Sequence, residues 1–424
     1  MSSLKFMEKL LAGASVVWKP LGSLGEFVRG SGLQKSDFRE SGVGCIHYGQ
    51  IYTYYGDYAY KTKSFVSSEL ASKFRKAKKG DLIIATTSEN IEDVCKPLVW
   101  LGEHEVCVSG ETYIFKHNQN PKYLAYCIKT PEFFDFKKRN QTGTKVVRVH
   151  GDKLSEFSVP IPCPDNPKKS LEIQGEIVRI LDTFTELTAE LTAELTARKK
   201  QYAYYRDQLL NFEEGEVEWK PLGEVCDYKN GFAFKSNLFR ESGHPIIRIT
   251  NINGSVVDLT DVKYFYPSDY REDTDNYLVK KGDILLAMSG ATTGKIGCYN
   301  LESVAYLNQR VGKFVPITDY LNNRYLYHFL LSKNEAMYVL AGGGAQPNLS
   351  SNTLMKKLYI PIPFPKDLKK SLDEQARISS VLDKLDALTT SITDGLPREI
   401  ELRQKQYEYY RNLLLTFPKN EIEA

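Results

Sequence analysis

The feature that most constrains the fold of this 424-residue chain is that it repeats itself. Residues 18–22 (WKPLG) return at 219–223, and residues 38–42 (FRESG) return at 239–243 with the same spacing. Chance does not plausibly give five such matches in the same order. We therefore expect a tandem duplication whose halves are related by a pseudo-two-fold axis and offer similar docking surfaces to two copies of one partner. The further matches are 160–162 with 361–363, 168–171 with 369–372, and 201–206 with 406–411.

The middle of the chain carries a short repeat of its own. Thr-Ala-Glu-Leu occurs twice, at 188–191 and 192–195, within a segment that predicts a continuous helix over about 171–212 because it is rich in Ala, Leu and Glu. Upstream of the repeat, apolar residues alternate steps of four and three, which is typical of a coiled coil. Inside it, leucines step by four, which is a stutter. A solvated spacer helix would fit this segment equally well, but its place between two halves that match favours a spacer of defined length. The expected spacer residues are Thr188, Leu191, Thr192 and Leu195.

A second long helix is expected near the C-terminus. Ser371-x-x-Glu374 has the form of a capping box at its start. Residues 394–397 (DGLP) should then break or kink the helix, with Pro397 opening a second helical piece. The chain also begins with what resembles the tail of such a helix, because residues 7–11 are similar to 206–210.

The two remaining parts are expected to be globular, so the fold class is α+β. In the first part we predict a strand with a glycine kink over 46–55, a buried strand at 82–85, a short helix over 121–129 and a polar loop at 141–145. The second part follows the same plan at 247–252, 281–284 and 341–348. The predicted divisions are a helix tail (1–13), a first globular domain (14–158), a central helix (159–214), a second globular domain (215–359) and a C-terminal helical region (360–424).

Composition narrows the function. No apolar run reaches the ~18 residues of a membrane span, and no signal peptide precedes Trp18, so we expect a cytoplasmic protein. The seven cysteines form no Cys-x-x-Cys pair, so the sequence predicts no metal site. Residues 1–158 carry 23 basic and 17 acidic side chains, a net charge of +6 within a total of +3. Many of the 27 tyrosines stand beside basic residues, a pattern that suits nucleic-acid contacts, although tyrosines in an ordinary sheet would look the same.

Two segments imitate catalytic motifs. Gly290 to Lys295 resembles a phosphate-binding loop, but only three residues separate its glycines and Ile296 follows the lysine. The glycines at 342–344 lack the strand and helix of a dinucleotide fingerprint, and the six histidines are scattered. We therefore expect a chain that binds without catalysing a reaction and that holds no cofactor.

These features together identify a resemblance. Two variable domains, each followed by a Pro-Ile-Pro entry into a long helix, resemble the specificity subunit of a Type I restriction–modification enzyme over essentially the whole chain. The Thr-Ala-Glu-Leu repeats are similar to those of the IC subgroup. The resemblance implies two target-recognition domains that each read half of a split, asymmetric DNA site, separated by two long helices that form an antiparallel coiled coil and act as a ruler.

It also implies double-stranded DNA, two methyltransferase subunits and two restriction subunits as partners, with S-adenosylmethionine, ATP and Mg²⁺ bound in those partners. The alternatives are a stand-alone bivalent DNA-binding regulator and a self-contained DNA enzyme, for which a cofactor motif would be needed.

Candidate DNA contacts come from the polar and aromatic segments. Family-like segments are Gly80-Asp81, Gly282-Asp283, Asn308-Gln309 and residues 346–349 (QPNL), and the first domain lacks the last two. The expected contacts in the first domain are Tyr48, Gln50, Tyr52, Lys61, Lys63, Thr142, Lys145 and Arg148. Those in the second are Arg248, Asn251, Lys295, Asn308, Gln309, Arg310, Gln346 and Asn348.

Overall fold

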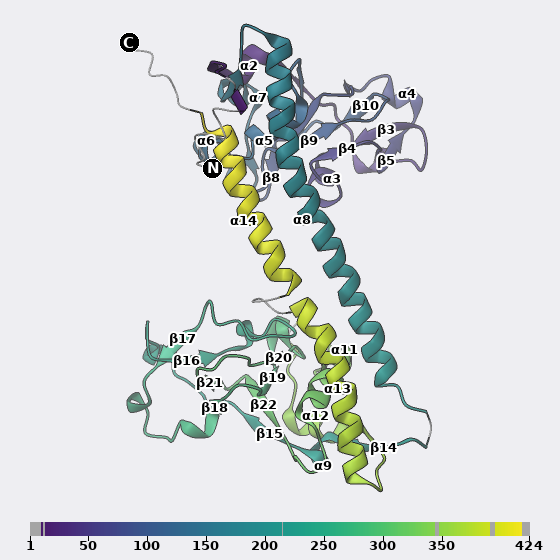
Figure 1. Cartoon of the computed structure of the whole chain (residues 1–424), viewed down its shortest axis with the longest axis vertical. Coiled ribbons are helices and arrows are strands. Elements are labelled where there is room, and N and C mark those ends of the chain that lie inside the picture. The colour runs from purple at the N-terminus through teal and green to yellow at the C-terminus, as the bar shows by residue number, and fades with distance from the viewer. Residues whose placement is uncertain (1–9, 12, 214, 344–346, 391–394, 418–424) are drawn as a thin grey trace. The chain divides into compact units, whose positions relative to one another are not determined.

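A computed structural model describes residues 10–11, 13–213, 215–343, 347–390 and 395–417. The chain forms two compact units, one from residues 1–188 with 402–424 and the other from residues 189–401 (Figure 1). Helix α8 (Pro167–Leu209) contributes residues to both units.

Unit 1 contains two ribbons of two strands each, two larger sheets and the helices that cover them. Strand β1 pairs antiparallel with β13, and a short ribbon joins β8 to β12. One sheet has the order β2-β11-β7-β9-β4, and the other has the order β5-β3-β10-β6. The elements are β1 (Val16–Pro20), α2 (Leu21–Leu24), β2 (Gly25–Arg29), β3 (Val43–Ile46), α3 (Tyr48–Thr53), β4 (Tyr58–Ala59), β5 (Ser64–Val66), α4 (Ser68–Ala71), β6 (Lys76–Ala77), β7 (Leu82–Ala85), β8 (Thr87–Ser88), β9 (Lys96–Trp100), β10 (Val106–Val108), β11 (Thr112–His117), α5 (Pro121–Cys127), α6 (Pro131–Asn140), β12 (Val147–Arg148), α7 (Gly151–Glu156) and β13 (Ser158–Pro162).

Unit 2 repeats this plan. Its ribbon joins β14 to β23, and its sheets have the orders β15-β22-β19-β20 and β17-β16-β21-β18. The elements are β14 (Val217–Pro221), α9 (Leu222–Val225), β15 (Cys226–Asn230), β16 (His244–Ile247), β17 (Lys263–Phe265), β18 (Leu278–Val279), β19 (Ile284–Ala287), β20 (Ile296–Cys298), β21 (Ala305–Leu307), β22 (Val311–Pro316), α10 (Asn323–Ser332), α11 (Asn334–Leu340), α12 (Ser351–Lys357), β23 (Tyr359–Pro363) and α13 (Leu368–Thr390). Short 3₁₀ turns include η3 (Ile249–Asn251) and η6 (Gly290–Thr292).

The duplication predicted from the sequence is confirmed down to strand register. Val16 lies opposite Pro162 in the first ribbon, and Val217 lies opposite Pro363 in the second, so both partners are displaced by the same number of residues. The parallel pair of β3 with β10 in unit 1 is matched by β16 with β21 in unit 2, and unit 1 has a further parallel pair, β4 with β9. The central strands β7 and β19 are buried along their whole length, which explains their runs of Leu and Ile.

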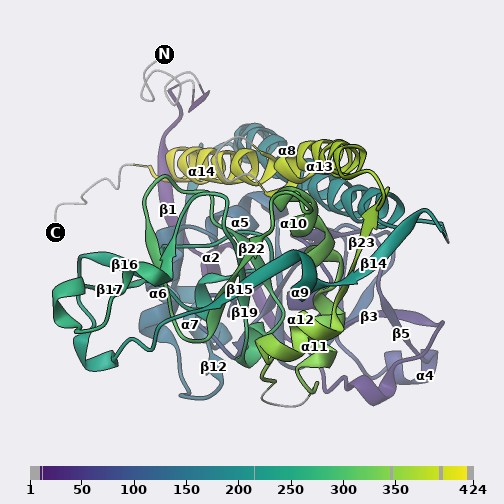
Figure 2. The same ribbon diagram turned by 90° about the horizontal axis from the view of Figure 1, so that it is seen from below.

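The predicted short helix at 121–129 is present as α5. Asn120 caps it by accepting hydrogen bonds from the N–H groups of Lys122 and Tyr123, and Pro121 occupies the first turn. Tyr123 is fully buried, and its hydroxyl donates to the Pro160 carbonyl at 2.6 Å. In unit 2, α10 lies between α13 and the sheet that contains β20 (Figure 2), and Tyr325 donates in the same way to Pro361.

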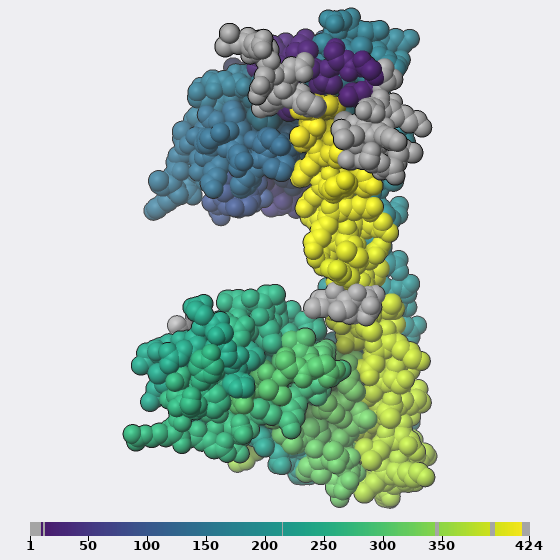
Figure 3. Space-filling model, turned by 60° about the vertical axis from the view of Figure 1, so that its left-hand side comes forward, coloured from purple at the N-terminus to yellow at the C-terminus, as the bar shows by residue number. Residues whose placement is uncertain are grey.

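The long helices agree with the sequence in outline. α8 is continuous over 43 residues. A second helical piece, α14 (Leu396–Leu415), begins with Pro397 in its first turn, as predicted, whereas Asp394 of the predicted break lies outside the described residues. In unit 2, α13 (yellow-green) packs against the globular part (green) as one body (Figure 3). Within the described residues, no helix is long and apolar enough to span a membrane.

Two local predictions are wrong. The predicted capping box at Ser371 is not the start of α13, because Asp367 caps this end by accepting the Lys370 N–H at 3.1 Å. Ser371 lies inside the helix, where its hydroxyl accepts a hydrogen bond from Gln375.

The segment 46–55 is also not one strand. Strand β3 ends at Ile46 and the short helix α3 follows. The His47 side chain accepts the Gly49 N–H, and the Gln50 side chain accepts the His47 N–H, so this reciprocal cap favours a helix over the β-propensity of the aromatic residues.

Candidate nucleic-acid interface

The two units present equivalent three-residue turns at one edge of their sheets. Residues 109–111 form the β10–β11 turn in unit 1, and residues 308–310 form the β21–β22 turn in unit 2. The first residue of each turn donates its N–H to the last carbonyl of the neighbouring parallel strand. The distance is 3.1 Å to Ile46 of β3 in unit 1 and 3.0 Å to Ile247 of β16 in unit 2. The last residue of each turn accepts an N–H at 3.0 Å, from Thr86 and from Met288. The backbones therefore match, while the side chains are Ser-Gly-Glu in one turn and Asn-Gln-Arg in the other.

The β10–β11 turn borders a recess of about 270 Å³. The Glu111 carboxylate accepts a hydrogen bond from the Thr87 hydroxyl at 2.5 Å and lies 3.7 Å from Arg148 Nε. Arg29 Nε donates to the Gly110 carbonyl at 3.0 Å, so a second guanidinium holds the turn itself. The recess is thus lined by one carboxylate and two arginines. Its lining residues are Arg29, Thr86, Thr87, Gly110, Glu111, Tyr113, Arg148, Val149 and His150.

The predicted polar loop of the first domain closes onto this recess. Thr142 and Arg148 exchange backbone hydrogen bonds of 2.8 and 2.9 Å, and β12 then pairs with β8. Thr142, Lys145 and Arg148 are all exposed. The structure therefore brings Arg148, on the same loop as Thr142 and Lys145, to Glu111. Sequence reasoning missed Glu111 because an acidic residue is not an expected contact for a polyanion.

Two predicted contacts in unit 1 are instead parts of the framework. The Gln50 side chain is buried; its oxygen accepts the His47 N–H at 3.1 Å, and its nitrogen donates to Ser64 at 2.7 Å. The Tyr52 hydroxyl lies 3.0 Å from the carbonyls of Ala85 and Thr87, and burial raises its pKa. The fold thus gives both polar groups partners of their own, and their assignment as DNA contacts stays a prediction.

The other predicted contacts on this part of unit 1 remain accessible. Tyr48 is half-buried, whereas Lys61 and Lys63 are exposed. The Lys63 ammonium lies 4.6 Å from the centre of the exposed Tyr54 ring. A cation held over an exposed aromatic ring is suited to a phosphate.

Asn251 in unit 2 repeats the role of Gln50. It is 3 % exposed, its side-chain oxygen accepts the Arg248 N–H at 2.9 Å, and its nitrogen donates to the carbonyls of Asp258 and Asp261. Its side-chain oxygen and nitrogen are thus both hydrogen-bonded within the fold, and its assignment as a DNA contact likewise stays a prediction.

A cluster of polar atoms without partners lies beside it. Arg248 Nε, Ser289 Oγ and Thr292 Oγ1 are buried and have no hydrogen-bond partner among the described residues. The loop that carries Ser289 and Thr292 contacts η3, since a Cβ added to Gly290 would lie 3.4 Å from Ile249 Cδ1. Buried polar groups normally find partners, so unsatisfied ones gathered on one loop indicate a place where a polar ligand binds.

The remaining predictions in unit 2 surround this loop. Asn348 is exposed and forms an isolated β-bridge with Ser289. The Lys295 N–H donates to the Thr292 carbonyl at 3.0 Å, and the side chains of Gln309 and Arg310 are exposed. Asn308 is half-buried at the start of the same turn. Gln346 lies outside the described residues.

In unit 1, one aspartate joins helix α5, which packs against the sheet, to the long helix α8. Asp182 on α8 pairs with Lys122 at 2.7 Å and accepts a hydrogen bond from the Tyr126 hydroxyl at 2.7 Å. The Tyr126 and Tyr407 rings lie 6.3 Å apart, so α14 also contributes to this joint.

Unit 2 has a joint in the equivalent place, built from different side chains. Asp383 on α13 accepts hydrogen bonds from Arg324 Nε and bonds His328 Nε2, both at 2.8 Å. His328 is fully buried, and its Nδ1 lies 2.9 Å from the Tyr202 hydroxyl on α8. Burial lowers the pKa of His328, although the hydrogen bond to Asp383 opposes this shift. A neutral ring that donates to Asp383 and accepts from Tyr202 satisfies both nitrogens.

The expected spacer residues all lie on α8. Thr188 donates its hydroxyl to the Phe184 carbonyl at 2.8 Å, and Phe184 stacks on Tyr410 of α14. Leu191 and Leu195 are half-buried and Thr192 is exposed. The repeats therefore lie on the continuous helix α8, as predicted.

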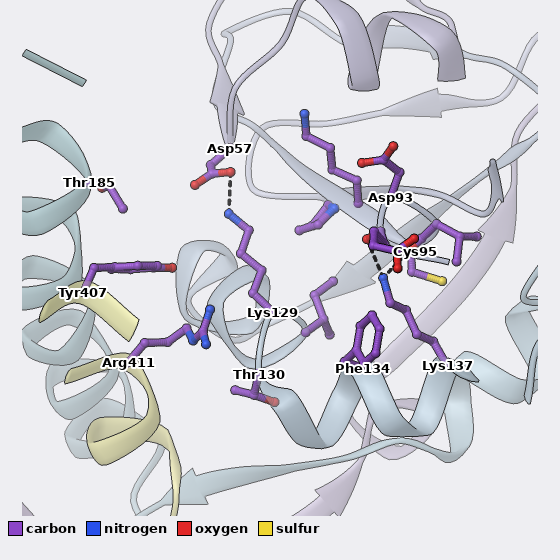
Figure 4. Close-up of a pocket in the computed structure, with 15 residues that line it drawn as sticks. Asp57, Asp93, Cys95, Lys129, Thr130, Phe134, Lys137, Thr185, Tyr407 and Arg411 are labelled. Atoms are coloured by element: carbon purple, nitrogen blue, oxygen red, sulfur yellow. Dashed lines mark hydrogen bonds and ion pairs between the residues drawn. The ribbon is translucent and has the colours of Figure 1, made fainter. Parts of the chain in front are cut away.

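A cavity of about 350 Å³ lies in unit 1, beside α14 (Figure 4). Its charged groups serve the fold: Lys137 donates to the carbonyls of Glu92 and Val94, and Lys129 pairs with Asp57. Among the described residues, no three His, Cys, Asp or Glu side chains gather as metal ligands. This cavity is therefore a poorer candidate for the functional site than the two turns.

Comparison with known proteins gives a consistent result. The Type I restriction modification DNA specificity domain matches residues 16–198 and again 214–402. A Type I restriction enzyme specificity subunit of Escherichia coli is 37 % identical over 433 residues, which cover 99 % of each chain. A putative specificity subunit of Haemophilus influenzae is 32 % identical, covering 97 % of this chain and 98 % of that one. The crystal structure of a Type I S subunit from M. genitalium matches with a TM-score of 0.58 at 15 % identity, covering 96 % of this chain and 98 % of that one.

Proposed function

The chain belongs to the family of Type I restriction–modification DNA specificity subunits, and we propose that it reads a bipartite, asymmetric DNA site with one half-site for each unit. Subunits of this family are non-catalytic, recognise DNA and assemble with other restriction–modification subunits. The full-length similarity does not favour a stand-alone regulator.

The recognition domains of this proposal are residues 14–158 and 215–359, and the helical regions are 159–214 and 360–424. Each proposed bound falls at the first residue of a ribbon strand, Ser158 of β13 and Tyr359 of β23, so the rest of that strand lies beyond the bound. β1 pairs with β13 just before α8, and β14 pairs with β23 just before α13.

One observation carries the proposal: the β10–β11 and β21–β22 turns share a backbone but differ in every side chain. The matched backbone hydrogen bonds give no structural reason for Glu in one turn and Arg in the other. Two domains that read different half-sites with one scaffold do have such a reason, because base edges present different donors and acceptors in the major groove.

The proposed contacts are the sequence-predicted residues whose polar groups are not consumed by the fold. Exposed cations such as Lys145 would contact phosphates, and the turns would contact bases. The proposed set is Tyr48, Lys61, Lys63, Thr142, Lys145, Arg148, Arg248, Lys295, Asn308, Gln309, Arg310, Gln346 and Asn348.

We further propose that two methyltransferase and two restriction subunits complete a cytoplasmic complex, and that S-adenosylmethionine, ATP and Mg²⁺ bind in those partners. The pseudo-symmetric halves support a pair of docking surfaces, because equivalent framework segments recur in each.

The Thr-Ala-Glu-Leu units would set the spacer between half-sites. One added unit turns α8 by a net of about 40° and lengthens it by about 6 Å. One base pair of DNA turns about 34–36°. Because a domain facing the wrong side of the duplex loses its base contacts, rotation should decide, and one unit should add one base pair.

The test is to express the chain with its partner subunits and map methylated sites across a genome. A split motif should appear, exchange of residues 14–158 for those of a relative should change one half only, and one added repeat should lengthen the spacer by one base pair. Both halves changing together would contradict independent reading. A spacer longer by two base pairs would show that length governs the fit, and an unchanged spacer would refute the ruler.

A further inference from the structure

We propose that Glu111 is a base-reading residue of the first recognition domain, and that its carboxylate accepts a hydrogen bond from the exocyclic amino group of a cytosine or an adenine in the major groove. This inference rests on the proposed function and adds to it a specificity determinant that the sequence did not indicate.

The first step is that the carboxylate is fixed. The Thr87 hydroxyl donates to Oε2 at 2.5 Å, and the Glu111 carbonyl accepts the Thr86 N–H at 3.0 Å. The turn itself is held because Thr112 donates its N–H to the Ser109 carbonyl and Arg29 donates to the Gly110 carbonyl. A side chain held in this way gives up little conformational entropy on binding, which is what sequence readout requires.

The second step is that the carboxylate still has capacity to bind. An ionised carboxylate accepts through two oxygens. One oxygen receives the Thr87 hydroxyl and lies 3.7 Å from Arg148 Nε, which is too far for a hydrogen bond. The other has no hydrogen-bond partner among the described residues, and the Glu111 side chain remains 35 % exposed on the wall of the recess.

The third step is electrostatic. A carboxylate beside DNA is repelled by phosphates and by the acceptor atoms of guanine and thymine. The hydrogen-bond donors that the major groove offers are the amino groups of cytosine and adenine. Arg29 and Arg148 line the same recess as Glu111 and supply the positive charge that allows a carboxylate to approach the duplex.

The fourth step is the contrast with unit 2. Arg310 occupies the place of Glu111, with the same backbone hydrogen bond to the neighbouring strand at 3.0 Å. A guanidinium at that place donates, and its usual partner is guanine. The same position of the scaffold therefore seeks a donor in the first domain and an acceptor in the second.

The experiment uses the full complex and compares Glu111→Ala with Arg148→Ala and with the control Glu103→Ala. Glu103 is an exposed carboxylate paired with Lys79 outside the recess, so the control removes the same charge and acceptor elsewhere. Methylated sites are mapped across a genome, and binding to a library of duplexes is measured at fixed salt concentration.

For Glu111→Ala, which leaves no hydrogen-bond acceptor on the side chain, we expect discrimination at one base pair of one half-site to fall by about 5- to 150-fold, with the other half-site unchanged. Arg148→Ala should weaken all sequences alike, and Glu103→Ala should bind as wild type does. Duplexes carrying purine for adenine, or 2-pyrimidinone for cytosine, at that base pair identify the donor. The correct replacement weakens wild type and leaves Glu111→Ala unaffected.

An unchanged motif for Glu111→Ala would overturn the inference. So would a uniform loss of affinity equal to that of Arg148→Ala, because it would make Glu111 only a counter-ion for Arg148. Failure of the proposed function would differ from both, since wild type itself would then yield no split motif.

Discussion

The two units fasten their sheets to the long helices with the same geometry but different chemistry. In unit 1 a lysine and a tyrosine meet Asp182, and in unit 2 an arginine and a histidine meet Asp383. The tyrosine hydroxyl ends the network in unit 1, whereas His328 passes it on to Tyr202. The duplicated scaffold has thus kept the place of the joint while its side chains diverged, and of the two joints only that of unit 2 contains a histidine, whose pKa is lowered by burial.

The largest contrast should come from breaking each joint at its equivalent residue. His328→Phe removes two hydrogen bonds and leaves Tyr202 and Asp383 without this partner, so we expect unit 2 to lose about 2–4 kcal/mol of stability. Tyr126→Phe removes one hydroxyl and should cost unit 1 about 1 kcal/mol. Amide hydrogen exchange in α10 and α5 measures the two effects separately. Equal losses would show that the histidine adds nothing to the joint.

A second contrast concerns the paired side-chain caps. Asn251→Ala removes three hydrogen bonds and should destabilise unit 2 by about 1–3 kcal/mol, whereas Gln50→Ala removes two and should cost unit 1 less. Thermal unfolding of the purified chain measures both. Neither variant should alter the bases recognised, and a changed methylation motif would restore these residues as DNA contacts.

A third contrast separates binding from folding. The buried Ser289 hydroxyl has no partner among the described residues, so Ser289→Ala should leave the unfolding midpoint unchanged while weakening DNA binding by about 1 kcal/mol. Ser88 in unit 1 is the control, because its hydroxyl already accepts the Asn90 N–H at 3.5 Å. Binding titrations with cognate DNA decide the matter, and a fall in stability without a change in affinity would mean that Ser289 serves the fold.

The smallest contrast is in pH dependence. Because burial lowers the pKa of His328 below its ordinary 6.5, the unfolded chain takes up a proton first, and unit 2 should lose stability as the pH falls below about 6.5. The effect should be modest, since the pKa of the neighbouring Asp386 is raised by burial and its protonation opposes the loss. Exchange in α10, corrected for its intrinsic rate, should rise between pH 7 and 5 while α5 stays protected. His328→Gln should abolish the difference, and an unchanged pH response in that variant would assign the effect to another group.

Much of the fold was accessible from sequence because duplication is a long-range signal. The matches around 160–162 and 361–363 predicted where the ribbons close, and Pro397 predicted the start of a second helical piece, which begins as α14 at Leu396. The helix at 48–53 was missed because its cap joins the His47 backbone to the Gln50 side chain, a contact that aromatic composition conceals.

The candidate site was accessible only in part. Lys145 and Asn348 were predicted as contacts because their loops contain few apolar residues, and both are exposed in the structure. An amide that reads a base and an amide that caps a turn look alike in sequence, and in the structure the Gln50 and Asn251 side chains hydrogen-bond within the fold. Glu111 was missed because its meaning depends on Arg148 and Thr87, which come close only in the folded chain.

The matched turns also bear on how such a protein can evolve. Neither Glu111 nor Arg310 contributes its side chain to a backbone hydrogen bond, while their carbonyls carry the same bond in each domain. Substitution at these positions therefore leaves the scaffold intact, and a lineage can acquire a new recognition sequence without first acquiring spare stability. Mutational drift and selection would then act on one side chain at a time, with each domain free to diverge from the other.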